Sequence, residues 1–272
     1  MSTPKKRVRL ARKPNAGPKK KAKAASKPKK KAKTSGTRSA AEDGFEVAMY
    51  ESPHTLVCGT FPSVKSLKNT EYYGHERNAF WHTAGEHFGF RRDLGTNLND
   101  RIAKGTYAGI VLLPKTLASP AITYDAQMEI LLKNGFALWD VLSRCERPGS
   151  LDSSIRHKGA DFWFADIEGL VKKTPSIKRI CFTSGCTSFK EFCKLKSNKA
   201  WLKEPGAFRC DPKDDRTITM FKDRKWLRHI VKETSEDAIV VCCLVSISPS
   251  MTMTYPDKRK EWLKLCWCPS PL

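Results

Sequence analysis

The chain has 272 residues and a formal net charge of +22, and the excess charge is concentrated at its beginning. Residues 1–40 contain 16 Lys and Arg and no Asp or Glu, which leaves 34 basic and 28 acidic residues for the other 232. This length allows one large domain or two small ones with a sizeable core. Runs of about 18 apolar residues and a signal-peptide core are both missing, which argues against a membrane partner and a secretory leader.

Residues 1–44 are predicted to form a disordered tail, because they are rich in Lys, Pro and Ala and have almost no apolar side chains to bury. Dense positive charge favours sequence-independent contact with nucleic acid, although a purely solubilising tail is the alternative. Within the tail, PKKRVRL (4–10) is typical of a nuclear localisation signal. The Lys and Pro content differs from the amphipathic, Arg-rich pattern of a mitochondrial transit peptide. We therefore expect a nuclear protein.

The ten cysteines are predicted to be reduced structural thiols. No C-x-x-C pair occurs, and the pair Cys266 and Cys268 has no matching second pair. Several cysteines lie in apolar runs, where Cys behaves as a small buried apolar residue. An iron–sulfur or zinc site is the alternative, but we expect neither a metal nor another cofactor.

From residue 45 onward, strands are predicted to alternate with helices. Four short apolar runs predict strands at 55–58, 137–142, 177–182 and 238–244, with apolar residues on both faces as in a sheet covered on two sides. Apolar spacings of three or four predict helices at 78–88, 125–133, 161–172, 188–195, 222–232 and 258–265. This order predicts one α/β domain over 45–272 with a mostly parallel sheet and helices on both faces. Residues 91–123 and 197–221 are predicted to be long loops.

Two segments are expected to meet at the binding edge of such a sheet, where ligands bind beyond the carboxyl ends of the strands. They are GTFPS (59–63) after the first strand and VSISPS (245–250) after the last. Gly59 permits a sharp turn and a close approach to a ligand, and Phe61 offers a face on which a planar base can stack. A structural turn with locally satisfied hydroxyl groups is the alternative for both segments.

The segment YYGHERNAFW (72–81) places aromatic and imidazole rings beside this edge. Together with Lys65 and Arg77, these rings suit stacking on a base and holding its flanking phosphates. Asn78 is of a residue type that favours the start of a helix. At that position its side-chain amide is directed at any group that lies above the end of the helix. For Phe80 and Trp81, which end the segment, the alternative is that they pack in an apolar core around the start of a helix.

These motifs resemble the hypoxanthine-DNA glycosylases, a branch of the uracil-DNA glycosylase superfamily. CGTFPS (58–63) with YYGHERNAFW is similar to the first motif of the family, and three later blocks follow in order over residues 50–265. The later blocks are NGFALWDVL (134–142) with CERPGSLDSSI (145–155), IKRICF (177–182) and SISPS (246–250). The resemblance implies a three-layer α/β/α fold with a central four-stranded parallel sheet. It also implies hydrolysis of the N-glycosidic bond of a deaminated base, hypoxanthine or uracil, in double-stranded DNA, which initiates base excision repair.

The chain also departs from the pattern of the superfamily. Phe61 and Pro62 stand where other branches carry the Asp or Asn that positions the hydrolytic water. In the hypoxanthine branch this polar role belongs to an Asn that matches Asn78. Residues 183–185 (TSG) replace the usual Asn-Gly, and residues 245–249 (VSISP) replace the usual Pro-Ser-Thr-Ser-Pro. These differences leave the preferred base open between hypoxanthine, uracil and mismatched thymine.

The resemblance and the residue pattern together assign roles to thirteen residues. Asn78 is predicted to be catalytic, orienting water or the base. The base-binding residues are predicted to be Gly59, Thr60, Phe61, Tyr73 and His75, and the DNA-binding residues Pro62, Ser63, Lys65, Arg77, Ser246, Ser248 and Pro249. No Lys or N-terminal Pro is placed to form a Schiff base, so we expect a monomeric enzyme that releases the base without cutting the strand. The alternative is a catalytically lapsed glycosylase fold that acts as a DNA- or chromatin-binding module.

Overall fold

The computed structural model describes residues 41–268 apart from 106, 108 and 156–162. Residues 1–40, which carry the predicted localisation signal and most of the predicted tail, lie outside the described residues. The described chain begins with strand β1 (Glu42–Asp43), which pairs antiparallel with β6 (Leu142–Cys145). Among the described residues, no helix is long and apolar enough to cross a membrane.

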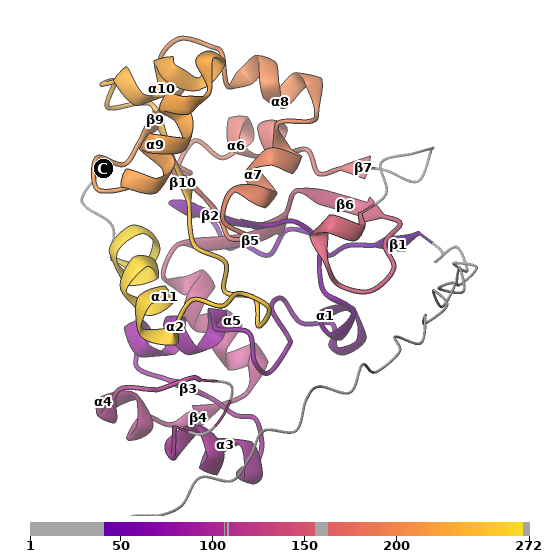
Figure 1. The fold of residues 1–272 in the computed structure, drawn as a ribbon, viewed down its shortest axis with the longest axis vertical. Coiled ribbons are helices and arrows are strands. Elements are labelled where there is room, and N and C mark those ends of the chain that lie inside the picture. The colour runs from indigo at the N-terminus through magenta and orange to yellow at the C-terminus, as the bar shows by residue number, and fades with distance from the viewer. Residues whose placement is uncertain (1–40, 106, 108, 156–162, 269–272) are drawn as a thin grey trace, which may run out of the picture. The chain divides into compact units, whose positions relative to one another are not determined.

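Five parallel strands form the central sheet, in the order β5-β2-β8-β10-β9 (Figure 1). They are β2 (Thr55–Gly59), β5 (Phe136–Asp140), β8 (Arg179–Phe182), β9 (Phe208–Cys210) and β10 (Ile239–Cys243). The predicted parallel α/β sheet is confirmed, but the predicted count of four strands was wrong. The fifth strand, β9, lies at the edge beside β10 and comes from the predicted loop 197–221. Its three residues are too few to show a detectable alternation of apolar and polar side chains in the sequence.

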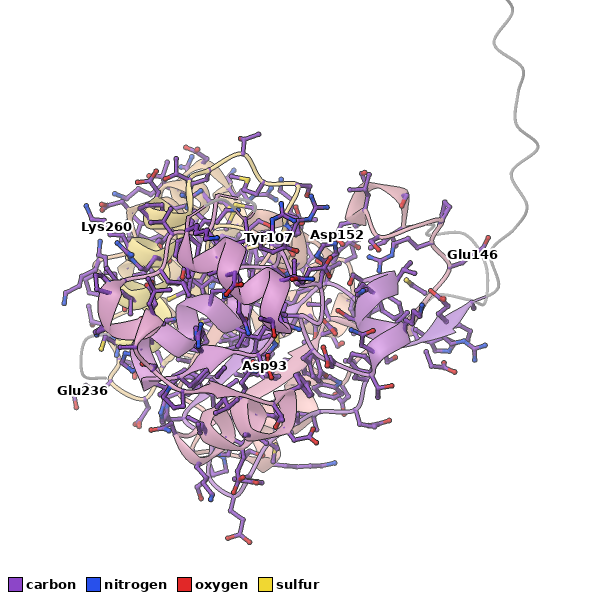
Figure 2. The ribbon with its side chains drawn as sticks, turned by 90° about the horizontal axis from the view of Figure 1, so that it is seen from below. Asp93, Tyr107, Glu146, Asp152, Glu236 and Lys260 are labelled. Atoms are coloured by element: carbon purple, nitrogen blue, oxygen red, sulfur yellow. The ribbon has the colours of Figure 1, made fainter. Side chains whose placement is uncertain are left out.

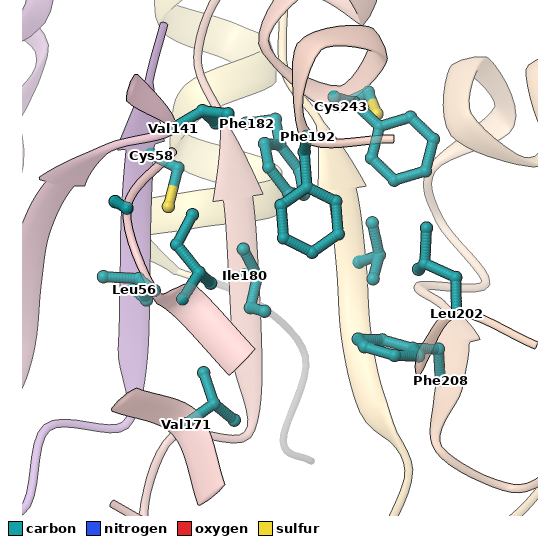
Figure 3. Packing of buried hydrophobic residues seen from close by; sticks show 14 of the residues in the cluster. Leu56, Cys58, Val141, Val171, Ile180, Phe182, Phe192, Leu202, Phe208 and Cys243 are labelled. Carbon is teal, nitrogen blue, oxygen red and sulfur yellow. The ribbon is translucent and has the colours of Figure 1, made fainter. Parts of the chain in front are cut away.

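Each face of the sheet packs into its own apolar core. In β2, Leu56 and Cys58 enter one core and Val57 enters the other, and all five residues of the strand are buried. Figure 3 shows part of the first core, where Phe182 and Phe192 are packed close together.

Helices cover both faces, which gives three layers (Figure 1). On the side of Leu56 lie α6 (Ile167–Lys173), α7 (Cys186–Phe192), α8 (Lys196–Trp201), α9 (Asp215–Asp223) and α10 (Arg228–Lys232). On the side of Val57 lie α2 (Phe80–Phe88), α5 (Tyr124–Lys133) and α11 (Tyr255–Trp262).

Several predicted helices have different bounds in the structure. The predicted helix 161–172 is helical only from Ile167, because Trp163–Phe164 pair antiparallel with β6 as strand β7 and the side chain of Asp166 caps the first turn of α6. The predicted helix 188–195 is α7, which ends at Phe192. Residues 222–232 are divided between α9 and α10, with a 3-10 turn at Lys225–Leu227 between them. Helix α11 begins before the predicted residue 258, because the side chain of Thr254 caps its first turn and Pro256 lies within that turn. The short helical elements α1 (Val64–Asn69), η1 (Asp152–Ser154) and the π-helical η3 (Leu263–Trp267) were not predicted separately.

Residues 91–123, predicted as a loop, contain four short elements. They are β3 (Arg91–Arg92), α3 (Thr96–Ala103), α4 (Pro114–Leu117) and β4 (Ala121–Ile122), with β3 paired to β4. The buried guanidinium of Arg92 lies 3.1 Å from the Glu71 carboxylate and donates to the carbonyls of Gly74 (3.1 Å) and His75 (3.3 Å). This segment therefore supports the loop between α1 and α2, which carries several of the predicted site residues.

All ten cysteines are free, and seven of them are buried. Burial is the main cause that raises the pKa of the Cys58, Cys181 and Cys243 thiols well above the usual value. A thiol that stays protonated is a poor nucleophile, so these side chains act as packing groups of the two cores.

Candidate active site

A cavity of about 390 Å³ opens at the carboxyl ends of four of the five parallel strands. Its wall is built from the last residue of β5, the segments that follow β2, β6, β8 and β10, one residue of α1, and the loop before α2. The lining residues are Gly59, Thr60, Phe61, Pro62, Ser63, Ser66, Tyr72, Tyr73, Asn78, Asp140, Ser150, Leu151, Asp152, Ser153, Thr183, Ser184, Thr187, Ser246, Ile247, Ser248, Ser250 and Met251. The cavity lies where a parallel sheet of this kind binds its ligands.

Nine of the thirteen predicted site residues line this cavity. They are Gly59, Thr60, Phe61, Pro62, Ser63, Tyr73, Asn78, Ser246 and Ser248. Two others, Arg77 and Pro249, line a neighbouring cavity of about 480 Å³, and Met251 lies in the wall of both. Parallel topology thus brings together segments almost 190 residues apart in the chain.

His75 and Lys65 line neither cavity and are directed at Glu76 instead. The Lys65 ammonium lies 3.8 Å from the Glu76 carboxylate, and the His75 ring nitrogen lies 3.7 Å from it. The same ring nitrogen, Nδ1, is 3.1 Å from the backbone N–H of Arg77. Burial lowers the pKa of His75, which favours the neutral ring. The structure therefore places these two side chains outside the cavity, beside its entrance loop.

Gly59 is required by a neighbouring strand as well as by the turn that it starts. It is in register with Asp140 at the end of β5, and a Cβ on Gly59 would collide with the Asp140 carboxylate. The same Cβ would lie 3.4 Å from the Tyr73 hydroxyl. Any side chain here would displace Asp140, so the glycine makes room for a carboxyl group within the cavity wall.

Phe61 both lines the cavity and packs in the core. It is only 6 % exposed, and the Arg147 guanidinium lies 5.2 Å from its ring centroid. Arg147 also donates to the carbonyl of Pro62 and lies 3.4 Å from Asp152. The segment after β6 thereby clamps the turn after β2, which stabilises the orientation of the Phe61 ring.

Asn78 stands at the entry to α2 and is held by that helix. Its side-chain Oδ1 accepts a hydrogen bond from the backbone N–H of Phe80 at 2.9 Å. The next residue, Ala79, donates its N–H to the carbonyl of Ile247 at 3.1 Å, which joins the loop after β10 to the start of the helix. With Oδ1 engaged, the amide nitrogen is the group of Asn78 that is left to donate to a ligand.

Tyr73 adopts a left-handed backbone conformation (φ 53°) that is uncommon for a residue with a side chain. Its ring stacks on Phe80, with centroids 4.1 Å apart and planes 20° apart, and its hydroxyl lies 3.4 Å from Thr183 Oγ1. The unusual turn is maintained by hydrogen bonds to the next residue, since Ser66 Oγ accepts from the N–H of Gly74 and Arg92 binds the Gly74 carbonyl.

Ser63 and the serines after β10 are engaged in local hydrogen bonds. Ser63 Oγ accepts from the N–H of Ser66 and caps α1. Ser246 Oγ accepts from the N–H of Ser248, and the Ser248 hydroxyl lies 2.9 Å from that of Ser250. These hydroxyl groups therefore order the backbone of the loops that surround the cavity.

Two acidic residues of the site had no role in the sequence prediction. Asp140 is 4 % exposed, and its Oδ2 is buried without a hydrogen-bond partner among the described residues. Burial, followed by repulsion from Asp152, raises the pKa of Asp140 to about 7, while Arg147 opposes the shift. An aspartate that ends an apolar strand was the available signal, because the carboxyl ends of such strands form the site.

Asp152, labelled in Figure 2, is the second of these acids. Its Oδ2 accepts a hydrogen bond from Thr60 Oγ1 at 2.8 Å, and Arg147 lies near its other oxygen. Burial raises its pKa, while Thr60 and Arg147 partly compensate. Asp152 is thus a partnered carboxyl group that ties the turn after β2 to the segment after β6, in contrast to Asp140.

Comparison with known proteins gives two relatives that carry the same name. A hypoxanthine DNA glycosylase of Methanosarcina acetivorans is 29 % identical over 139 residues, which are 51 % of this chain and 68 % of that protein. A hypoxanthine DNA glycosylase of Methanosarcina barkeri is 27 % identical over 115 residues, which are 42 % of this chain and 56 % of that protein. No protein-family model matches the chain.

The chain is also similar to a solved structure. It is the solution NMR structure of a Methanosarcina acetivorans protein assigned provisionally as a uracil DNA glycosylase. It covers 82 % of this chain and 94 % of its own, with 20 % sequence identity and a TM-score of 0.46.

The sequence relatives define the class of this protein as the DNA N-glycosylases. Within that class, the two relatives carry the name of the hypoxanthine branch, which is the branch that the motifs of this chain resemble.

Proposed function

We propose that the chain is a monofunctional DNA glycosylase that hydrolyses the N-glycosidic bond of a deaminated base, hypoxanthine or uracil, and so initiates base excision repair. The observation that carries this proposal is the cavity at the carboxyl edge of the sheet, with Phe61 and Tyr73 in its wall and Asn78 and Ser246 beside them. Its volume of about 390 Å³ is in the range of pockets that enclose a small ligand. The two named relatives support hypoxanthine as the base.

The target nucleotide must leave the duplex before it can react. A base within the stack cannot be reached, so the enzyme rotates the nucleotide out and holds its base in the cavity. Unstacking costs a few kcal/mol and is least for a mispaired base, which contributes to selectivity. In this site, Phe61 and Tyr73 supply the aromatic surface that replaces the lost stacking.

Hydrolysis then separates charge between the sugar and the base. The C1′–N bond breaks, the sugar becomes oxocarbenium-like, and the oxygen of a water molecule bonds to C1′ while the departing base gains a proton. Fixed dipoles at the site of developing charge are the main source of catalysis in such steps. Asn78 orients the water or the base through its free amide N–H groups, and backbone amides at Gly59 and Thr60 stabilise the charge on the base.

The proposed contacts to the DNA backbone lie around the cavity. Ser246 and Ser248 lie in its wall and bind the phosphates beside the flipped nucleotide, while Arg77 and Pro249 line the neighbouring cavity. Lys65 contributes positive charge at the entrance. The basic residues 1–40 add sequence-independent affinity for DNA and direct the protein to the nucleus, where it acts as a monomer.

The proposal is tested with labelled duplexes that contain one hypoxanthine, uracil or xanthine. After incubation with the protein, half of each sample is treated with alkali, which cuts the strand at an abasic site. We expect cleavage only after alkali, strongest for hypoxanthine. Strand breaks before alkali would contradict the monofunctional assignment. Salt-sensitive DNA binding without release of any base would instead identify a lapsed glycosylase that serves as a DNA-binding module.

A further inference from the structure

We propose that the neighbouring cavity of about 480 Å³ is a second nucleotide subsite, which binds the nucleotide next to the flipped one in the same DNA strand. This inference rests on the proposed function and adds a binding site to it. The base of that second nucleotide packs on the apolar wall of the cavity, and its phosphate lies beside Arg77 and Lys258.

The two cavities are directly adjacent. Asn78 lines the first cavity, while the residues on either side of it, Arg77 and Ala79, line the second. Met251 lies in the wall of both, and the loop after β10 continues from one cavity to the other. Consecutive nucleotides of one strand are covalently joined and can occupy two sites at this short spacing. The base opposite the flipped nucleotide belongs to the other strand.

Apolar side chains form much of the second cavity, as in sites that hold a planar base. They are Ala79, Ile110, Val111, Pro249, Met251, Met253 and Pro256. The Val111 side chain is 49 % exposed, so a base that packs on it buries apolar surface that the free protein leaves in water. The cavity is larger than the first one, which measures about 390 Å³, and a base therefore fits.

The wall that carries Val111 is held in place by two helices. Two residues further on, the N–H of Leu113 donates to Glu86 Oε1 of α2 at 3.0 Å. Glu86 is 2 % exposed, and its other oxygen lies 3.5 Å from Arg259 Nε of α11. The subsite is thus largely preformed, which lowers the entropy that a ligand must overcome on binding.

The charge of the second cavity suits a phosphate. Arg77 and Lys258 line it, and no carboxylate does so among the described residues. Lys258 is 7 % exposed, and its Nζ donates to the carbonyls of Ser248 and Met251 at 3.2 Å each. An ammonium group has three N–H donors, so one is left for a ligand. Burial lowers the pKa of Lys258, and a bound phosphate would compensate for this desolvation.

The test measures binding of short single strands that contain one hypoxanthine on a 2′-fluorinated sugar, which slows hydrolysis. In two further strands, tetrahydrofuran replaces the base on the 5′ or the 3′ side of hypoxanthine and keeps every phosphate. The wild type should bind one of these two strands about tenfold more weakly, as expected for the loss of one base from an apolar wall. Because no complementary strand is present, the base opposite cannot cause this difference.

Val111→Glu places a carboxylate in the apolar wall and should abolish the difference between the strands. The matched control is Tyr50→Glu, which adds the same charge at an exposed aromatic residue outside both cavities and should keep the difference. Both positions are exposed, and thermal unfolding checks that both variants are folded.

A neutral methylphosphonate tests the two cations. It replaces the phosphate on the far side of the second nucleotide, away from hypoxanthine. This change should weaken binding by the wild type and have less effect on Arg77→Gln, which has already lost one of the two charges. An equal effect on both proteins would remove Arg77 from the subsite.

Equal binding of all three strands by the wild type, or a difference that persists in Val111→Glu, would overturn the proposal. A difference that appears only with a complementary strand would assign the cavity to the opposite base and would also overturn it. These measurements need no base release. A protein that releases hypoxanthine but binds the three strands equally would refute the second subsite alone, whereas one that discriminates between them without releasing any base would refute the proposed function alone.

Discussion

At the scale of single residues, Asn78 makes one hydrogen bond that stabilises helix α2 and is proposed to make a second one in catalysis. Two substitutions distinguish the effects of these two bonds. Its Oδ1 accepts from the N–H of Phe80, which leaves the amide nitrogen for the ligand. Asn78→Ala should lower the free energy of unfolding by about 1 kcal/mol, as for a lost helix-start bond, and base release by about 100-fold. Asn78→Asp keeps the acceptor and loses the donor, so it should keep its stability and lose activity.

Denaturant unfolding and single-turnover kinetics on a hypoxanthine duplex measure these two effects separately. Full activity of Asn78→Asp would mean that Asn78 acts by accepting a hydrogen bond from water and not by donating one. Full activity of Asn78→Ala would remove Asn78 from the mechanism altogether.

The buried carboxyl of Asp140 predicts an unusual dependence of stability on pH. Its pKa is about 7 in the folded chain and 3.8 for an ordinary Asp, so the folded state binds the proton more tightly. This contribution to stability is therefore present below pH 4 and is lost as the pH rises to 7. Asp140→Asn removes the titration and should be more stable than the wild type at pH 8, by at most about 4 kcal/mol.

Thermal unfolding of both proteins from pH 4.5 to 8 checks this expectation. The difference in melting temperature should increase with pH up to about 7 and then level off. A constant difference would show that Asp140 does not titrate in this range.

At the scale of elements, the segment 91–123 determines how firmly the loop before α2 is held. Arg92 of β3 reaches the Glu71 carboxylate and the carbonyls of Gly74 and His75 with one buried guanidinium. Arg92→Met should lower the free energy of unfolding by about 3 kcal/mol, because it leaves buried acceptors unpaired. It should also lower base release, because Tyr73 lies in the loop that is released.

The matched control is Lys104→Ala, which removes an exposed cation at the end of α3 in the same segment and should change neither quantity. Urea unfolding and kinetics at saturating protein provide the two measurements. A destabilised Arg92→Met with the wild-type rate at a permissive temperature would show that the clamp serves stability alone.

At the scale of the whole molecule, the uneven charge predicts two separable kinds of DNA binding. One is sequence-independent contact by the basic residues 1–40, and the other is binding of the flipped nucleotide in the cavity. Lys19, Lys20, Lys21, Lys29, Lys30 and Lys31 are changed to Gln in the full chain. Each phosphate contact that is lost should reduce the slope of log affinity against log salt by about 0.9. Base release at saturating protein should stay unchanged, because the proposed chemistry is carried by cavity residues between Gly59 and Ser248.

Fluorescence anisotropy on an undamaged duplex at several salt concentrations measures this slope. An unchanged slope would mean that the tail does not contact DNA. A reduced rate at saturation would instead connect the tail to the chemical step.

The sequence by itself determined the parallel α/β fold and most of the cavity wall. Buried strands and amphipathic helices produce local periodic patterns, and the ligand edge of a parallel sheet follows from the strand order. For this reason the sequence predicted Gly59, Phe61 and Asn78 at the site, and all three line the cavity.

Only the tertiary structure decided the properties that depend on partners distant in the chain. Strand β9 is too short to show a pattern, and its place at the sheet edge comes from pairing with β10. His75 does not line the cavity, and its backbone carbonyl is held by Arg92, 17 residues further along the chain. Asp140 has its raised pKa because the fold buries it near Asp152. The free energy of a charged group depends on its desolvation and on its neighbours in space, and neither can be read from local sequence.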